Sequence, residues 1–202
     1  MKRSTSILGV TAAVLLGAVI AHASVSVGQS APDFKVKDTS GKEQSLSAYK
    51  GKFVVLEWTN PGCPFVQKHY DTANMPSTQK SAEAKGVVWL TVSSTAKDAG
   101  DYKQPSELAA WLKEKGAAPT AVLMDDDGKI GHAYGARTTP HMFIISPEGK
   151  LVYAGAIDSK ATARKDDVKG ATNYVSVALN EALAGKPVTK ASSEPYGCSI
   201  KY

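Results

Sequence analysis

The two cysteines, Cys63 and Cys198, are the residues of this chain best suited to covalent chemistry. Cys63 follows an apolar run at 52–59 and the turn Asn60-Pro61-Gly62, and a segment with helical spacing begins directly after it. A thiol at the start of a helix faces unpaired backbone N–H groups and the positive end of the helix dipole, and both favour the thiolate. This placement predicts a reactive, accessible sulfur.

A structural disulfide is the competing interpretation. A bridge between Cys63 and Cys198 would close a loop of nearly the whole chain, and the chain-entropy model gives roughly 5 kcal/mol of stabilisation for such a loop. That interpretation does not explain why one of the two cysteines stands at the start of a helix.

The first 23 residues have the pattern of an export signal. Lys2 and Arg3 precede an apolar stretch at 7–20, and Ala21-His22-Ala23 supplies the small-x-small cleavage pattern. The stretch is short for a membrane span, which takes about 20 residues, although an uncleaved anchor is the alternative. We therefore expect a periplasmic or secreted protein, in a compartment where disulfides persist.

The charge pattern argues against nucleic acid as a partner. The formal net charge is +5, and removal of Lys2 and Arg3 with the signal would lower it by two. The remaining basic residues are spread along the chain and form no block interleaved with aromatic residues. We expect no nucleic-acid binding and no membrane contact after signal cleavage, and no feature marks a subunit interface.

The hydrophobic pattern alternates strands with helices and ends in a hairpin. It predicts strands at 53–59, 87–92, 120–124, 142–145 and 151–154, with helices at 64–85, 105–115 and 172–184 and a short one ending at Tyr134. The first helix should kink or restart at Met75-Pro76. This order predicts an α/β domain (24–186) whose mixed sheet has a parallel core, an antiparallel C-terminal hairpin and helices on both faces, followed by a tail (187–202).

Thr139-Pro140 is the second chemical signal. Proline before a strongly apolar strand must occupy its first position or an edge, because it cannot donate to a central ladder. In thioredoxin-like proteins a Thr-Pro with a cis peptide bond stands at this place, beside the reactive cysteine. The chain resembles that superfamily here.

Four separated segments make the resemblance more specific. Residues 57–70 resemble the reactive loop of the redoxin branch, the peroxiredoxin-like proteins grouped with alkyl hydroperoxide reductase and thiol-specific antioxidant. Residues 28–34 resemble the opening of that family, 134–141 its cis-proline region, and 195–202 the tail of an exported subgroup. The resemblance implies a thioredoxin-like fold and a thiol-dependent oxidoreductase that needs no bound cofactor.

The chain also departs from the patterns of its family. Val66 stands where thioredoxins have their second cysteine, so there is no vicinal dithiol. Asn60 and Leu56 occupy the positions of the peroxiredoxin Thr and Pro, whereas Cys63-Pro64 is kept. Pro140 fills the slot of the peroxiredoxin arginine, and Arg137, three residues earlier, remains as a source of positive charge near the sulfur.

The resemblance implies roles for both cysteines. Cys63 would attack a peroxide or a disulfide, and Cys198, on a short Gly-containing tail able to swing, would resolve the intermediate. One cysteine at a helix start with a distant second one favours peroxide slightly. Disulfide exchange with partner proteins, without peroxidase activity, is the alternative, and either cycle needs a reducing partner thiol protein.

Other residues are candidates for the substrate pocket. Asn60 and Pro61 would shape the loop and offer a hydrogen bond to substrate, or serve as plain turn residues. Glu57, if buried, would suit proton transfer, whereas a wet strand end would remove that role. His141 follows Pro140 and is a candidate pocket residue, while helix geometry predicts surface positions for Lys68 and His69.

Two further functions compete with the enzymatic one. Cys63, Cys198 and one or two histidines could bind Cu(I) or Zn(II), but no Cys/His pair has ligand spacing, so we expect no metal. A redox-inert binding module with a structural disulfide is the other alternative.

Overall fold

A five-stranded mixed sheet forms the centre of the computed structural model, which describes residues 24–202. The predicted signal peptide (1–23) lies outside the described residues. The strand order is β5-β4-β3-β7-β8, with β3, β4 and β5 parallel and β7 antiparallel to both of its neighbours. The strands are β3 (Val54–Trp58), β4 (Val88–Ser93), β5 (Ala121–Met124), β7 (His141–Ile145) and β8 (Leu151–Gly155). The predicted parallel core and antiparallel hairpin are confirmed.

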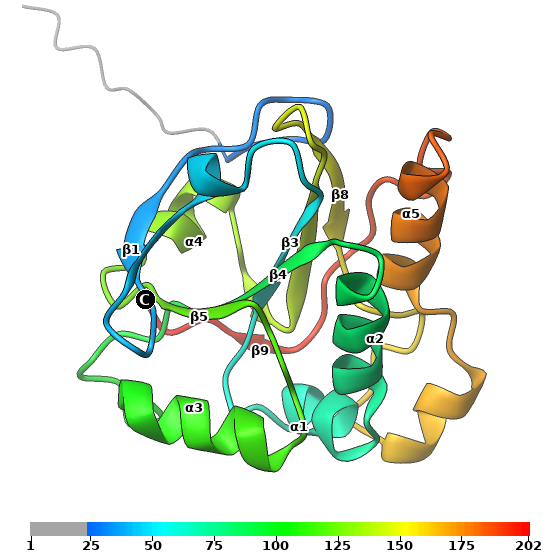
Figure 1. Cartoon of the computed structure of the whole chain (residues 1–202). Helices are drawn as coiled ribbons and strands as arrows, with labels where there is room; N and C mark the ends of the chain where they lie inside the picture. Colours follow the sequence, from blue (N-terminus) through cyan, green and yellow to red (C-terminus); the bar gives the residue numbers. More distant parts are fainter. Residues whose placement is uncertain (1–23) are drawn as a thin grey trace, which may run out of the picture.

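Both faces of this sheet are covered, which explains its nearly continuous apolar strands. Side chains alternate between the faces, so that Val55 joins one core cluster while Val54 and Leu56 join the other. Apolar side chains of α1, α2, α3 and α5 fill the first cluster, and α4 and the 3-10 helix η1 contribute to the second. Their bounds are α1 (Pro64–Asp71), α2 (Asn74–Glu83), α3 (Pro105–Glu114), α4 (Lys129–Tyr134), α5 (Tyr174–Leu183) and η1 (Leu46–Tyr49). Figure 1 shows α2 and α5 side by side at one side of the sheet.

The break in the long helical segment comes slightly earlier than predicted. Ala73, with φ of 57°, separates α1 from α2, and Pro76 lies within the first turn of α2. Proline is tolerated there because the first N–H groups of a helix have no partner inside the helix. The remaining elements are short: β1 (Lys35–Lys37), β2 (Glu43–Ser45), β6 (Thr138–Thr139), the 3-10 helix η2 (Lys165–Gly170) and β9 (Cys198–Ser199).

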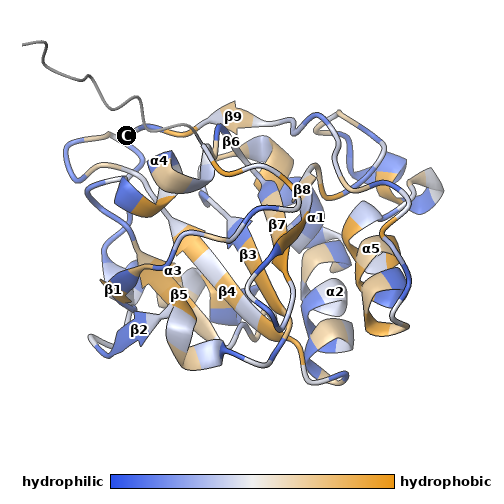
Figure 2. Ribbon diagram, turned by 90° about the horizontal axis from the view of Figure 1, so that it is seen from above, coloured by the Kyte–Doolittle hydropathy of each residue, from blue (hydrophilic) through white to orange (hydrophobic). Residues whose placement is uncertain are grey.

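The C-terminal tail is docked along its length rather than free to swing. It first exchanges backbone hydrogen bonds with Ala154 at the end of β8. Its strand β9 then pairs antiparallel with β6, as seen at the upper edge of Figure 2. Beyond β9, the carbonyl of Lys201 accepts from Ala96 N–H at 2.7 Å, and the Tyr202 hydroxyl donates to Ala136 O at 2.7 Å. Within residues 24–202, none of the helices has the length and apolar character needed to cross a membrane.

Candidate active site

Cys63 is the N-cap residue of α1, as its position after the β3 strand and the turn predicts. The turn is closed by two bonds to Asn60: Cys63 N–H donates to its backbone oxygen at 3.0 Å, and Gly62 N–H to its Oδ1 at 2.7 Å. The Asn60 amide also donates to Asp101 Oδ2 and Thr95 Oγ1. Asn60 therefore shapes the loop, and its side chain is already engaged within the protein.

The Cys63 sulfur lies at the cis-proline turn. Thr139–Pro140 is a cis peptide bond, as predicted, and the Cys63 thiol donates to the carbonyl oxygen of Thr139 at 3.0 Å. The expectation of an accessible sulfur is wrong for this conformation, because Cys63 is only 2% exposed. The C-terminal tail packs over it, with Tyr196 and Cys198 lying against the same core cluster.

Cys198 stands directly opposite Thr139 in the β6–β9 pair. Cys198 packs against the core cluster that contains Cys63, and both cysteines are free thiols in this structure. Burial raises the pKa of Cys198 to about 12, and its interaction with Cys63 acts in the same direction. Cys198 is thus held protonated at neutral pH, next to the cysteine that stands at the helix N-terminus.

Gly197 allows this close approach. Its φ is +139°, a conformation that side chains rarely adopt, and a Cβ at this position would lie 2.7 Å from the carbonyl carbon of Thr139. Only glycine brings the tail this close to the cis-proline turn.

Glu57 is buried, but its carboxylate is not directed at either sulfur. It accepts four hydrogen bonds, from Tyr70 Oη (2.6 Å), Trp89 Nε1 (2.7 Å), Gln79 Nε2 (2.9 Å) and Thr91 Oγ1 (3.2 Å). Burial raises the pKa of Glu57, and these donors oppose the rise. The geometry gives Glu57 a place in the core rather than a direct contact with Cys63.

Arg137 and His141 also lie away from the sulfur. The side chain of Arg137 is 61% exposed, and its guanidinium pairs with Glu194 at 2.8 Å. His141 shares its sheet face with Phe143, in the core cluster opposite the one that holds Cys63, and its Nδ1 accepts from Arg137 N–H at 3.3 Å. Pro61 and Pro64 flank Cys63 in the loop and at the first position of α1.

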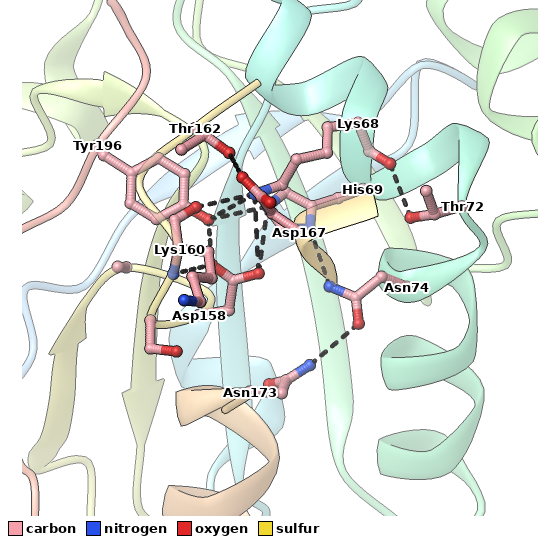
Figure 3. A network of polar contacts seen from close by, with 12 residues as sticks. Lys68, His69, Thr72, Asn74, Asp158, Lys160, Thr162, Asp167, Asn173 and Tyr196 are labelled. Atoms are coloured by element: carbon pink, nitrogen blue, oxygen red, sulfur yellow. Dashed lines mark hydrogen bonds and ion pairs between the residues drawn. The ribbon is translucent and has the colours of Figure 1, made fainter. Parts of the chain in front are cut away.

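The prediction that Lys68 and His69 lie on the surface is wrong. Both side chains are fully buried and belong to a polar cluster beneath the tail, shown in Figure 3. The cluster also contains Asp158, which follows β8, and Tyr196 of the tail. Helical spacing alone does not indicate burial here, because the partners that make it tolerable come from distant parts of the chain. One feature of the sequence points to this cluster, namely that Tyr196 lies two residues before Cys198.

Residues 24–202 contain no group of three or more His, Cys, Asp or Glu side chains arranged to hold a metal ion. The thiol pair and the cis-proline turn are therefore the chemical features that the fold brings together.

A family model described as the AhpC/TSA family matches residues 27–154. The chain belongs to the AhpC/TSA family. Its similarity to the thiol-disulfide oxidoreductase ResA of Bacillus subtilis (strain 168) is 32% identity over 129 residues, which is 64% of this chain and 66% of that protein. It is 27% identical to the peroxiredoxin Bcp of the same organism over 147 residues, 63% of this chain and 83% of the relative. These names agree with the prediction of a thiol-dependent oxidoreductase.

The thioredoxin-like fold of this AhpC/TSA protein is also found in solved structures. An uncharacterized conserved protein from Geobacillus kaustophilus superimposes with a TM-score of 0.74 at 24% identity, covering 88% of this chain and 92% of the other. The family match ends at residue 154. Asp158, Tyr196 and Cys198 therefore lie outside the segment that matches the family model.

Proposed function

We propose that this protein is an exported thiol-disulfide oxidoreductase in which Cys63 attacks a substrate disulfide and Cys198 resolves the intermediate. The observation that carries the proposal is that the fold brings the two cysteines together at the cis-proline turn. Cys63 donates to Thr139 O, and Cys198 is paired with the same residue in β9 and packs against the cluster that contains Cys63.

The cycle transfers two electrons from the cysteine pair to the substrate. The Cys63 thiolate attacks one substrate sulfur, a mixed disulfide forms, and the other substrate sulfur leaves as a thiolate and takes up a proton. The Cys198 thiol then loses its proton and attacks Cys63, which releases the reduced substrate and leaves a Cys63–Cys198 disulfide. A reducing partner dithiol restores both thiols and becomes oxidised itself.

The structure and the relatives favour a disulfide over a peroxide as the substrate. The arginine of the peroxiredoxin pattern is replaced by Pro140, and Arg137 points to Glu194 instead of the sulfur. Asn60, in the position of the peroxiredoxin threonine, is bonded to Asp101 and Thr95. Peroxide reduction is a second candidate because Cys63-Pro64 is kept and Bcp is among the relatives. In that case Cys63 would become a sulfenic acid, and Cys198 would displace water from it.

The test is to trap the intermediate on Cys63. Reduced wild type and Cys198→Ser receive one equivalent of oxidised glutathione or of hydrogen peroxide, and each cysteine is followed by mass spectrometry. We expect a stable Cys63–glutathione adduct in Cys198→Ser and a Cys63–Cys198 disulfide in the wild type. A faster reaction with peroxide would select the second candidate. If neither oxidant modifies Cys63 faster than a thiol in an unfolded control peptide, both are refuted.

Export is part of the proposal and has its own test. An oxidising compartment would let the cysteine pair cycle against disulfide substrates. N-terminal sequencing of the protein recovered from the producing cells should give Ser24 as the first residue. An intact Met1 in all of the recovered protein would argue against a cleaved signal.

A further inference from the structure

The polar cluster beneath the tail connects Cys198 to the helix that carries Cys63. Cys63 caps the N-terminus of α1, and Lys68 and His69 lie five and six residues farther along that helix. Tyr196 lies two residues before Cys198 in the tail. Five helical residues advance about 7.5 Å, and two extended residues advance about 6.6 Å, so the two spans are closely matched. A tail held at Lys68 and His69 by Tyr196 therefore reaches Cys63 with Cys198.

The Tyr196 hydroxyl is held in one position by three buried partners. It donates to Asp158 Oδ1, accepts from His69 Nε2 at 3.0 Å, and receives a longer bond from Lys68 Nζ at 3.5 Å (Figure 3). Its ring packs on Phe65 in the first turn of α1, with ring centroids 5.9 Å apart. The tail is thus held by directional bonds to the helix as well as by apolar contact.

The direction of each hydrogen bond in the cluster is determined by its neighbours. Because the Tyr196 proton goes to Asp158, His69 must donate from Nε2, and its Nδ1 then accepts from the Asn74 amide at 2.8 Å. If His69 were protonated, Nδ1 would carry a proton and face the donor N–H of the Asn74 amide, and this hydrogen bond would be lost. This arrangement agrees with burial lowering the pKa of His69 to about 4. His69 is therefore neutral at physiological pH.

The buried charges depend on the tail. Lys68 and Asp158 are almost fully buried, with Lys68 Nζ 3.8 Å from Asp158 Oδ2, and burial lowers the pKa of Lys68. Without the Tyr196 hydroxyl, Asp158 Oδ1 keeps one hydrogen bond, from Lys160 N–H at 2.9 Å, and His69 Nε2 loses its acceptor. Buried charges that lose a partner are strongly disfavoured, so the docked tail is the favoured state.

We propose that Tyr196 is a positioning residue, whose hydroxyl, held by Asp158, His69 and Lys68, fixes Cys198 against Cys63 and keeps Cys63 covered. This inference rests on the proposed function, because it concerns how the resolving cysteine is presented. The tail must lift for a substrate to reach Cys63, and the cluster returns Cys198 to the sulfur afterwards.

The test compares Tyr196→Phe with the wild type in two measurements. The first is the equilibrium in a glutathione buffer, where two protein thiols and one oxidised glutathione give the Cys63–Cys198 disulfide and two reduced glutathione molecules. The second is the rate at which iodoacetamide alkylates Cys63 in the reduced protein. A hydrogen bond to a charged group corresponds to about a ten- to hundredfold change in an equilibrium constant. We expect the disulfide equilibrium constant to fall about tenfold or more and the alkylation rate to rise.

Tyr202→Phe is the matched control. It removes a tail hydroxyl that donates to Ala136 O, on the other side of Cys198 and away from α1. We expect it to change either measurement less than Tyr196→Phe does. Asp158→Asn keeps an oxygen acceptor for Tyr196 but removes the charge, so it should shift both measurements in the same direction and carries the test if Tyr196→Phe does not fold.

The outcomes separate this inference from the proposed function. A wild type that forms no Cys63–Cys198 disulfide at any glutathione ratio overturns both. A wild type that forms it, with Tyr196→Phe within twofold of it in both measurements or indistinguishable from Tyr202→Phe, overturns the positioning role alone. A lower melting temperature of Tyr196→Phe with unchanged thiol measurements would show a structural role only and would also overturn it.

Discussion

Acidification from pH 7 to pH 5 should destabilise this protein, because two histidines are buried in neutral form. Burial lowers the pKa of His69 from its usual 6.5 to about 4, with the charge of Lys68 adding to this and that of Asp158 opposing it. Burial lowers the pKa of His141 to about 3, with the charge of Arg137 adding to it. His69 Nδ1 faces the Asn74 amide, and His141 Nδ1 accepts from the Arg137 N–H, so neither ring can take a proton without losing a bond.

The sign and size follow from proton linkage. Both folded pKa values are below the unfolded value, so between about pH 6.5 and pH 4 the unfolded chain binds more protons than the folded one. Stability is therefore complete above the unfolded pKa and falls as the pH falls. Between pH 7 and pH 5 each histidine should remove about 2 kcal/mol from the free energy of unfolding, about 4 kcal/mol together.

Urea unfolding of the reduced protein at pH 7 and pH 5, at constant ionic strength, measures this loss. His141→Asn is the informative variant, because its side-chain oxygen can accept the Arg137 N–H without titrating. We expect the variant to be less stable at both pH values but to lose only about 2 kcal/mol between them. A wild-type loss below about 1 kcal/mol, or an equal loss in His141→Asn, would refute the reasoning.

Three further predictions concern the thiol pair and the core. Gly197→Ala should separate β9 from β6, because the added Cβ would meet Thr139, and alkylation of Cys63 should then be faster. Gly100→Ala is the control, because nothing lies within 4 Å of its Cβ. Equal alkylation rates in the two variants would show that position 197 does not need glycine. Oxidation to the Cys63–Cys198 disulfide should raise the free energy of unfolding by up to about 5 kcal/mol. Urea unfolding with and without reductant measures this difference. An oxidised protein that is no more stable than the reduced one would contradict the docked tail. Glu57→Ala leaves four buried donors without their acceptor and should lower the free energy of unfolding by about 3 kcal/mol or more. For Glu43→Ala, at an exposed position, we expect a loss of about 0.5 kcal/mol or less. Similar losses in the two variants would show that the Glu57 hydrogen bonds contribute little.

The parts of the fold that follow local patterns could be predicted from the sequence. Five apolar runs gave the central strands, and the Thr139-Pro140 pair marked the turn that receives Cys63. The positions of the residues proposed for a substrate pocket were less predictable. Arg137 and His141 are close to Pro140 in sequence, but the alternation of side chains along β7 sends His141 to the opposite sheet face, and Glu194 draws Arg137 outward.

Sequence alone determined that the Cys63 thiol begins a helix and which turn it meets, because strand period, helix start and proline geometry are properties of a few neighbouring residues. Tertiary structure decided that Lys68 and His69 are buried, since burying a charge requires partners, and Asp158 and Tyr196 are supplied from far along the chain. It also decided that the tail covers Cys63 and that Cys198 packs near it. Both outcomes depend on the docked tail, and its long-range contacts cannot be predicted from local sequence patterns.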